Sequence, residues 1–565
     1  MSGSEQQSSG AQATSRLSFT SRIKKYSRVV VHHTVKHTGV GIVCAVAYFD
    51  PGNWGVDLQA GSQFGYKLLF VVLLAGIFAV FLQVLASRLG CVTGLDLASH
   101  CRLLLHSRPK HTLLYRWGLL YPLYVLSEIA IISTDLAELL GSAIALCLLF
   151  PKLPLWAGVL LTASDVLVLL TLRDPLGGKP VRMFELLIAA LVFTVLVCMA
   201  LIISRVGVHW GDAFFGFIPS STLFKSGGLY TSIGIIGATV MPHSIFLGSA
   251  LATQDRLSPS QPAEEPQLPT KSDKDSKASS EFSGSVKLPA KLWNAYKDIR
   301  GSFLSNFRIV PVQAFADAPK SHKDRENRAY ADVIAHIYHG MVDIIVSLLG
   351  FAVVINSMIL ILASAVFFYG SGQGSGGPAS LFDAYDLLRD NVGQAAATLF
   401  ALALLASGQS SSIIATMAGQ AVSEGFLRWR ISPILRRLLT RALGIIPSMA
   451  VAIGVGRSGV DALLVASQVA LSIVLPFIVF PLIYLTTNKE IMSVKKPVPE
   501  PAPMQQRQPT QSSIEYLDVE STKKEEMVDF SNGKIAASIG YLIWFVVMAA
   551  NVYAIVTLAM GEGGA

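Results

Sequence analysis

The chain has 565 residues, of which 52% are hydrophobic and 15% are charged, and its formal net charge is +8. Soluble proteins carry about 25% charged residues, so this composition excludes a soluble domain and indicates an integral membrane protein. The 46 Gly and 26 Pro follow no period, which excludes a collagen-like chain and fits membrane helices. The net charge does not predict nucleic-acid binding, because Lys and Arg also mark the cytoplasmic side of membrane proteins.

Other whole-chain signals exclude further classes. The five cysteines lie in or beside apolar runs without Cys-x-x-Cys spacing, which argues against a disulfide framework or a zinc site. The sequence has no phosphate-binding loop and no recognisable enzyme site, so we expect neither catalysis nor direct coupling to ATP hydrolysis. Residues 1–37 lack the apolar core and cleavage site of a signal peptide, and we expect them to form a disordered cytoplasmic N-terminus.

Eleven apolar windows are long enough to cross a hydrocarbon core of about 30 Å, which takes about 20 helical residues. The predicted fold is therefore an all-α integral membrane protein with eleven transmembrane helices. The windows are 38–63, 67–87, 117–149, 154–172, 183–204, 228–253, 333–369, 394–424, 438–456, 459–485 and 535–560.

Two long polar segments separate some of these windows. Residues 255–330 and 487–532 are rich in Pro, Ser and charged side chains, and we expect them to be solvated, disordered linkers. Both are predicted to lie in the cytoplasm, where they offer sites for cytosolic regulators.

The positions of the cations predict the orientation. If the N-terminus is cytoplasmic and the sides alternate, most of the 45 Lys and Arg fall on the cytoplasmic side. We therefore predict a cytoplasmic N-terminus and an extracellular or lumenal C-terminus, in the plasma membrane or a vacuolar or endosomal membrane. The opposite side then holds Lys67, Lys152, Arg205, Lys225, Arg389 and Arg457.

The first and sixth windows each contain a helix-breaking sequence at mid-depth. The first break is Asp50–Asn53, with the sequence Asp-Pro-Gly-Asn, and the second lies in Gly237–His243. Five spans separate them, which is typical of a LeuT-like fold with two five-helix inverted repeats and a substrate site where the unwound helices meet. The predicted parts are the repeats 38–206 and 207–485, the linker 486–532, and the eleventh helix with a short C-terminus in 533–565.

The first break carries oxygen donors for a cation. A carboxylate at the centre of a membrane helix costs about 2.5 to 3.5 kcal/mol on insertion scales, so Asp50 requires a partner, and a cation is the natural candidate. Pro51 frees the carbonyl of Ala47, four residues earlier. Asn53 adds an amide oxygen.

The second break adds a softer donor. Pro242 frees the carbonyl of Ala238, and Met241 brings a thioether sulfur. Calcium and magnesium prefer oxygen ligands alone, whereas a thioether favours a transition ion such as manganese, iron, cobalt, zinc or cadmium. The alternative is that Met241 only packs against neighbouring side chains within the membrane and that Asp50 only caps the broken helix. Their occurrence in repeat-related breaks favours a divalent transition-metal site.

A second group of titratable residues lies on the third span. Glu128, Asp135 and Glu138 are spaced seven and three apart, so they share one helical face. Together with His243 and the cations that open the ninth span, they form a candidate proton route to the cytoplasm. A static buried ion-pair network remains the alternative. The cations in question are Arg436, Arg437 and Arg441.

These motifs resemble those of the Nramp family of proton-coupled divalent-metal transporters, and are most similar to its fungal manganese and iron transporters. The match covers nearly all of residues 38–485. The motif Asp50-Pro-Gly-Asn53 resembles the family's first-helix motif, Met241-Pro-His243 resembles its sixth-helix motif, and Gly408–Ser412 resembles its transport signature.

The resemblance implies a role for each site residue. Asp50, Asn53 and Met241 would be side-chain metal ligands, with backbone oxygens from Ala47 and Ala238. Gln468 would join the site when it occludes. Asn356 and Gln409 would act in gating. The proton route would comprise His243, Glu128, Asp135, Glu138 and one of the three arginines named above.

One position departs from the family pattern. Many relatives have a second histidine five residues after His243, where this chain has Gly248, so a proton role for that histidine does not transfer. The function expected from the resemblance is import of manganese or iron into the cytoplasm, driven by protons, with no cofactor. The alternatives are a metal sensor that binds without transport, an amino-acid transporter of the same fold, and a magnesium-selective relative. Asp50 argues against a carboxylate substrate, and Met241 argues against magnesium.

Overall fold

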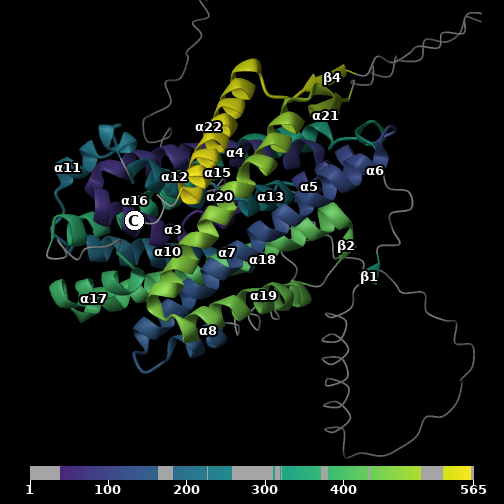
Figure 1. The fold of residues 1–565 in the computed structure, drawn as a ribbon. Helices are drawn as coiled ribbons and strands as arrows, with labels where there is room; N and C mark the ends of the chain where they lie inside the picture. The colour runs from purple at the N-terminus through teal and green to yellow at the C-terminus, as the bar shows by residue number, and fades with distance from the viewer. Residues whose placement is uncertain are drawn as a thin grey trace, which may run out of the picture.

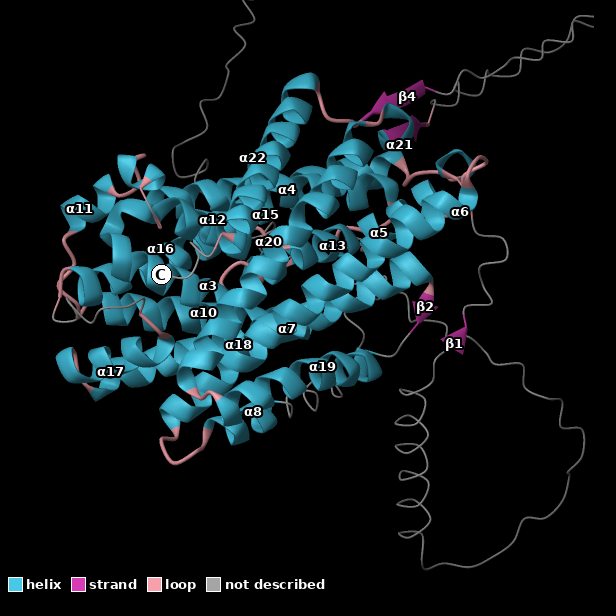
Figure 2. Cartoon of the chain, viewed as in Figure 1, coloured by secondary structure: helices cyan, strands magenta, loops and turns pink. Residues whose placement is uncertain are grey.

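The computed structural model describes residues 39–162, 182–225, 227–256, 310–311, 319, 321–370, 379–430, 433–497 and 526–560. These residues are almost entirely helical (Figures 1 and 2). The helices of the first half are α2 Val40–Val46, α3 Pro51–Phe64, α4 Leu69–Thr93, α5 Leu97–Leu105, α6 Thr112–Tyr115, α7 Tyr121–Leu149, α8 Leu155–Thr162, α10 Arg182–Ile203, α11 Trp210–Phe215, α12 Gly228–Thr239 and α13 Pro242–Leu251.

The second half continues the helical bundle and adds two short strand pairs. Its helices are α15 Tyr330–Ser347, α16 Val354–Ala363, α17 Leu381–Asn391, α18 Gln394–Leu427, α19 Pro433–Gly454, α20 Arg457–Thr487, α21 Lys489–Met492 and α22 Lys534–Ala559. The π-helical stretches Leu348–Val353 and Ser364–Phe368 flank α16. The antiparallel strand pairs are β1 Val310–Pro311 with β2 Trp429–Arg430, and β3 Ser493–Lys496 with β4 Glu526–Asp529.

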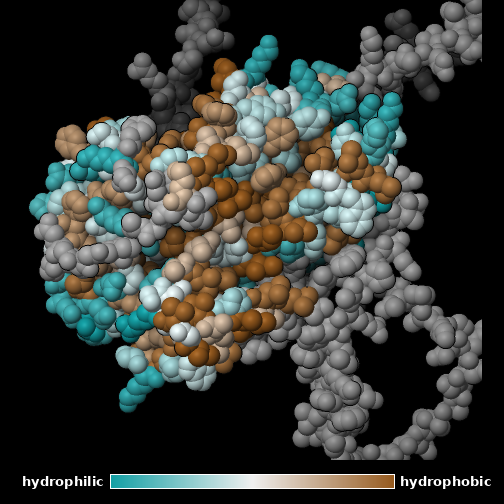
Figure 3. Space-filling model, viewed as in Figure 1, coloured by the Kyte–Doolittle hydropathy of each residue, from teal (hydrophilic) through white to brown (hydrophobic). Residues whose placement is uncertain are grey.

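Eight helical stretches in the described residues are long and apolar enough to cross a membrane. On the face shown in Figure 3, hydrophobic side chains cover the middle of the molecule and hydrophilic ones gather toward its ends. The eight stretches are Pro51–Thr93, Thr112–Leu149, Met183–Ile203, Gly228–Leu251, Tyr330–Phe368, Gln394–Leu427, Arg457–Thr487 and Lys534–Tyr553.

The difference from the eleven predicted windows has identifiable causes. The first window is divided between α2 and α3, and α3 continues into the second window through the 3₁₀ turn Gly65–Leu68. The fourth window extends past Thr162 into residues outside the described part, and the ninth contains the shorter apolar helix Ala442–Gly454. The structure is therefore a helical, membrane-type bundle, and its number of spans depends on how these three windows are counted.

Close helix packing positions the first break. The helices α7 and α18 lie side by side, and α20 crosses them in Figure 1. A Cβ added to Gly141 of α7 would meet Pro51, and one added to Gly408 of α18 would meet the Ser142 hydroxyl. Both glycines are therefore needed for α3, α7 and α18 to approach closely, and a larger residue at either position would force the helices apart.

The end of the first polar segment packs against α5 and contacts the start of the second polar segment. The Nδ1 atom of His100 lies 2.9 Å from Nε2 of His322. Burial, and then the nearby Arg325, lowers the pKa of His322 to about 4, and burial holds the pKa of His100 well below its usual value. Both rings are therefore neutral at neutral pH, which permits the N–H···N bond. The Asn327 amide also donates to the carbonyl of Ser493, at 2.7 Å.

Candidate metal site

The first break lies between α2 and α3. Helix α2 ends at Val46, and α3 begins at Pro51, whose missing N–H is tolerated in a first helical turn. Asp50 is the N-cap residue of α3, with extended backbone at φ −63° and ψ 167°. Its Oδ1 accepts hydrogen bonds from the Asn53 backbone N–H at 3.0 Å and the Asn53 side-chain amide at 2.7 Å. The sequence Asp-Pro-Gly-Asn thus forms a capped helix start inside the membrane protein.

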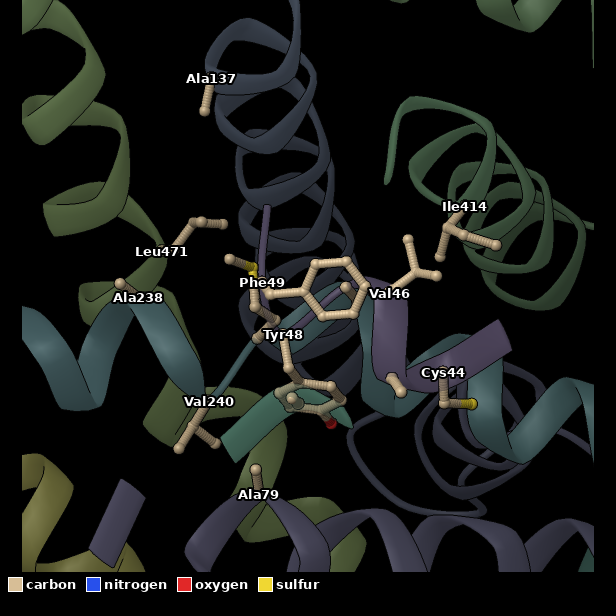
Figure 4. Packing of buried hydrophobic residues seen from close by; sticks show 14 of the residues in the cluster. Cys44, Val46, Tyr48, Phe49, Ala79, Ala137, Ala238, Val240, Ile414 and Leu471 are labelled. Atoms are coloured by element: carbon tan, nitrogen blue, oxygen red, sulfur yellow. The ribbon is translucent and has the colours of Figure 1, made fainter. Parts of the chain in front are cut away.

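The second break lies between α12 and α13 and meets the first. Helix α12 ends at Thr239, and α13 begins at Pro242 with Met241 as its N-cap residue, in extended conformation. The Asn53 amide also donates to the carbonyl of Ala238 at 3.1 Å, across 185 residues of sequence. Ala238 and Val240 lie near Tyr48 and Phe49 in Figure 4. A hydrogen bond therefore joins the start of α3 to the end of α12.

Carbonyls within the first break are hydrogen-bonded by neighbouring helices. The Ser407 hydroxyl of α18 donates to the Phe49 carbonyl at 2.7 Å, and the Trp54 indole donates to the same oxygen at 3.1 Å. The Asn356 amide of α16 donates to the Tyr48 carbonyl at 2.7 Å. Because buried carbonyls need donors, α16 and α18 fix the non-helical conformation of residues 47–50.

The Asp50 carboxylate is buried and only half satisfied. Its side chain is 0% exposed, and its Oδ2 has no hydrogen-bond partner among the described residues. A buried carboxylate oxygen without a donor is costly unless a positive charge meets it. The geometry therefore suits a cation at Oδ2.

The other predicted ligands lie at the breaks. Met241 and Ala47 are 0% exposed. Gln468 of α20 reaches the first break, because a Cβ added to Gly52 would meet its side-chain amide. The Oε1 atom of Gln468 has no hydrogen-bond partner in the described part of the chain, while its Nε2 donates to the Ser467 hydroxyl at 3.2 Å. The Oε1 atom of Gln468 is thus a further oxygen close to the first break that could bind a cation.

The titratable stripe is in α7, as predicted. Asp135 and Glu138 are 1% and 0% exposed, and Glu128 is half-buried. The Thr134 hydroxyl lies 3.2 Å from Nδ1 of His243, so α7 and α13 touch at the predicted route. The remaining members fall on the first turns of α19, outside the residues whose side chains are described. They are Arg436, Arg437 and Arg441.

The two predicted gating residues occupy different environments. Asn356 is buried and bonded to the first break, as described above. Gln409 is part-buried on α18, and its amide donates to Ser142 of α7 at 3.3 Å. Of the two, Asn356 donates a hydrogen bond to the segment between α2 and α3, so it is the better placed to sense movement of α2.

Sequence reasoning missed a polar network beside the second break. Gln83 of α4 is 0% exposed, and its Oε1 accepts from the Tyr48 hydroxyl at 2.9 Å and the Ser244 hydroxyl at 3.3 Å. Its Nε2 lies 3.2 Å from the Cys44 sulfur. A Cβ added to Gly248 would meet that same Nε2. The Gln83 amide thus fills the space beside Gly248, where many relatives have a second histidine. The sequence signal for this network was a single amide side chain, Gln83, within an apolar window.

Replacing Gly248 by His is expected to destabilise the protein. The new side chain would displace the Gln83 amide from its three partners, and overpacking typically costs about 1 to 3 kcal/mol. Thermal unfolding of the purified protein measures this. Gly340→Ala is the matched control, since the nearest atom to a Cβ on that glycine of α15 is the Ser87 hydroxyl at 3.6 Å. A Gly248→His protein as stable as wild type would contradict the interpretation.

A second unpredicted feature holds the start of α2. The backbone N–H groups of Gly39 and Gly41 donate to Oδ2 of Asp343 of α15, at 3.2 and 2.7 Å. Nearby, the Arg256 guanidinium and the Glu185 carboxylate form an ion pair at 2.6 Å, with side chains 6% and 11% exposed. A helix start favours a negative charge, so Asp343 anchors α2. These residues are distant in sequence, and no local pattern reveals their contact.

Another buried carboxylate lies seven residues after Asp50 on the same face of α3. Asp57 is 2% exposed, and its Oδ2 has no hydrogen-bond partner among the described residues. A second buried carboxyl group therefore lies on α3, two helical turns after Asp50.

The fold is that of a helical integral membrane protein, with a buried carboxylate where α2 ends and α3 begins. A family model described as natural resistance-associated macrophage protein-like matches residues 41–287 and 308–497. The chain belongs to this family, Nramp. Members of the family are metal-ion transporters and not enzymes, and the metal is their substrate rather than a resident cofactor.

Individual relatives agree with this assignment. The chain is 40% identical to the manganese transporter pdt1 of Schizosaccharomyces pombe, over 93% of this chain and 86% of that protein. It is 36% identical to the iron transporter SMF3 of Saccharomyces cerevisiae, over 94% and 98%. A crystal structure of a mutant manganese transporter from Eremococcus coleocola is similar with a TM-score of 0.65 and 27% identity, covering 94% of this chain and 88% of that one. The resemblance predicted from the motifs is confirmed.

Proposed function

We propose that the protein is a proton-coupled secondary transporter that imports divalent transition-metal ions, manganese and iron in particular, into the cytoplasm. The observation that carries the proposal is the buried Asp50 Oδ2 atom, to which no group in the described part of the chain donates a hydrogen bond. Relatives named manganese and iron transporters support the choice of metals.

The donor set supports a transition metal over calcium or magnesium. Asp50, Asn53 and Gln468 offer side-chain oxygens, and Ala47 and Ala238 offer backbone oxygens. Met241 adds the only soft donor in the set. Hard cations gain nothing from a thioether, whereas manganese, iron and cadmium accept it. The proposed site therefore favours divalent cations through the Asp50 charge, and transition metals among them through the Met241 sulfur.

Alternating access is the mechanism proposed for movement through this site. In a five-plus-five inverted repeat, the broken helices α2–α3 and α12–α13 would rock against the bundle that contains α7 and α18. The N-terminus would be cytoplasmic, and the C-terminus, following an eleventh span, would lie on the opposite side. Side chains at the breaks are fully buried, which is compatible with an occluded state closed to both sides.

Protons would be carried along α7. Metal binding favours the Asp50 carboxylate, while protonation weakens the site for release. His243 contacts α7 at Thr134, close to Asp135 and Glu138, which would link the site to the titratable stripe. A static ion-pair network on α7 would instead leave transport independent of protons.

Uptake of manganese into liposomes is expected to increase when an inward proton gradient is imposed. The gradient drives protons through the same cycle that carries the metal, so accumulation should exceed the level reached at equal pH. The measurement is time-resolved uptake with and without a protonophore. Uptake that a collapsed gradient leaves unchanged contradicts the coupling. Vesicles that bind manganese and never accumulate it would favour the alternative function, a metal sensor of the same fold.

A further inference from the structure

The last helix, α22, makes polar contacts in the interior of the protein that the transport motifs do not explain. Asn551 is 4% exposed, and its Nδ2 donates to the Ser472 carbonyl of α20 at 2.6 Å. The Ser472 hydroxyl donates in turn to Oδ1 of Asn551. Amides within membrane helices are costly, and they are typically used to bind a neighbouring helix. Figure 1 shows α22 lying beside α20.

A proline in α20 explains why Ser472 needs this partner. Pro476 has no N–H, so the carbonyl of Ser472, four residues earlier, has no helical donor. Asn551 supplies the missing hydrogen bond. Two turns earlier on the same face of α22, the Trp544 indole donates to the Pro476 carbonyl at 3.0 Å. The final helix therefore donates hydrogen bonds to two carbonyls of α20, those of Ser472 and Pro476.

Ser472 is connected to the candidate metal site in two directions. Gln468 lies one turn before it on the same face of α20, and its amide touches Gly52 in the first break. On the other side, a Cβ added to Gly237 would lie 2.5 Å from the Ser472 Cβ and 2.7 Å from its hydroxyl. Gly237 directly precedes Ala238, whose carbonyl meets Asn53.

We propose that Asn551 is a positioning residue for metal binding. By holding Ser472, it fixes the turn of α20 that presents Gln468 to the first break and the surface against which Gly237 packs. This inference rests on the proposed metal site. It assigns to the appended eleventh helix a role in metal affinity, in addition to membrane anchoring.

The test is Asn551→Leu, which keeps the number and branching of the side-chain heavy atoms and removes both hydrogen bonds. The KM for manganese uptake and the Kd for manganese binding to the purified protein are expected to rise about three- to tenfold, as expected for interhelical hydrogen bonds of about 0.6 to 1.4 kcal/mol. The matched control is Val552→Leu on the same helix, with Val552 54% exposed. A purely structural role would lower the maximal rate through loss of folded protein and leave KM and Kd unchanged, which would overturn the proposal.

A second variant keeps the proposal testable if Asn551→Leu does not fold. Ser472→Ala removes the hydroxyl and keeps the bond from Asn551 to the backbone carbonyl, so a smaller rise in KM and Kd is expected, and unchanged values overturn the proposal. Asp50→Asn is measured in parallel. If that variant transports normally, the proposed metal site is wrong. If it is inactive while Asn551→Leu and Ser472→Ala bind manganese like wild type, only the role of Asn551 is wrong.

Discussion

Asp50→Asn is expected to abolish metal uptake while leaving the protein at least as stable as wild type. The neutral amide retains an oxygen that can cap α3 and accept from Asn53. It removes the buried charge whose Oδ2 lacks a donor, and with it the attraction for a dication. Loss of at least about 2.7 kcal/mol of interaction would lower uptake about a hundredfold. Manganese uptake into liposomes and thermal unfolding of the purified variant measure the two effects.

The combination of the two measurements separates a site residue from a structural one. Asp386→Asn in α17 is the matched control, because that carboxylate is 45% exposed and lies outside both breaks. It should change neither uptake nor stability by a measurable amount. If Asp50→Asn transports manganese at the wild-type rate, the metal is not held at Asp50. If the variant is inactive and strongly destabilised, its carboxylate is needed for folding and the assignment of a ligand loses its support.

Met241→Leu is expected to change which metals are transported. Leucine keeps the buried volume, so the cost in stability should stay below about 1.5 kcal/mol, and only the sulfur is lost. The softest ions depend most on that sulfur. Cadmium uptake should therefore fall more than manganese uptake, and the ratio of calcium to cadmium uptake should rise. Competition assays with the three ions on the same liposomes measure this ratio.

Met417→Leu is the control for this substitution. Met417 is 3% exposed in α18 and is not at either break, so its replacement tests loss of a buried thioether away from the site. It should leave the order of metal preference unchanged. An unchanged ratio in Met241→Leu would show that the sulfur takes no part in selection, and Met241 would then be ordinary packing.

The sequence was sufficient for those features that depend on local chemistry. Pro51 and Pro242 cannot continue a helix, so both breaks were predictable to within a residue or two. The spacing of Asp135 and Glu138 places them together on α7 wherever that helix lies. The number of membrane spans was less determined, because α3 and α4 are joined by a short turn that hydropathy does not resolve.

Contacts between distant segments were beyond local patterns. Nothing near Asp343 indicates that its carboxylate binds the amides of α2, some 300 residues earlier. The use of Gln83 to fill the space above Gly248 depends on the packing of α4 against α13. The same holds for Asn551, whose partner is a carbonyl exposed by a proline on another helix. Each requires the three-dimensional arrangement.

If the protein works by the proposed alternating access, the anchoring of α2 by Asp343 would affect both the rate of ion leak and the rate of turnover. The helix has seven residues, and two of the N–H groups at its start are held by one carboxylate. In the proposed alternating-access cycle, release of an ion toward that side would require α2 to give up these bonds, which are worth about 1.5 to 3 kcal/mol each when an ionised group takes part. Stronger hydrogen bonds to Asp343 would lower the rate of spontaneous opening and also the rate of ion release. Weaker ones would raise the rate of release and also the rate of ion leak without coupled protons. Natural selection for tighter coupling or for faster transport could therefore act on the strength of these two hydrogen bonds.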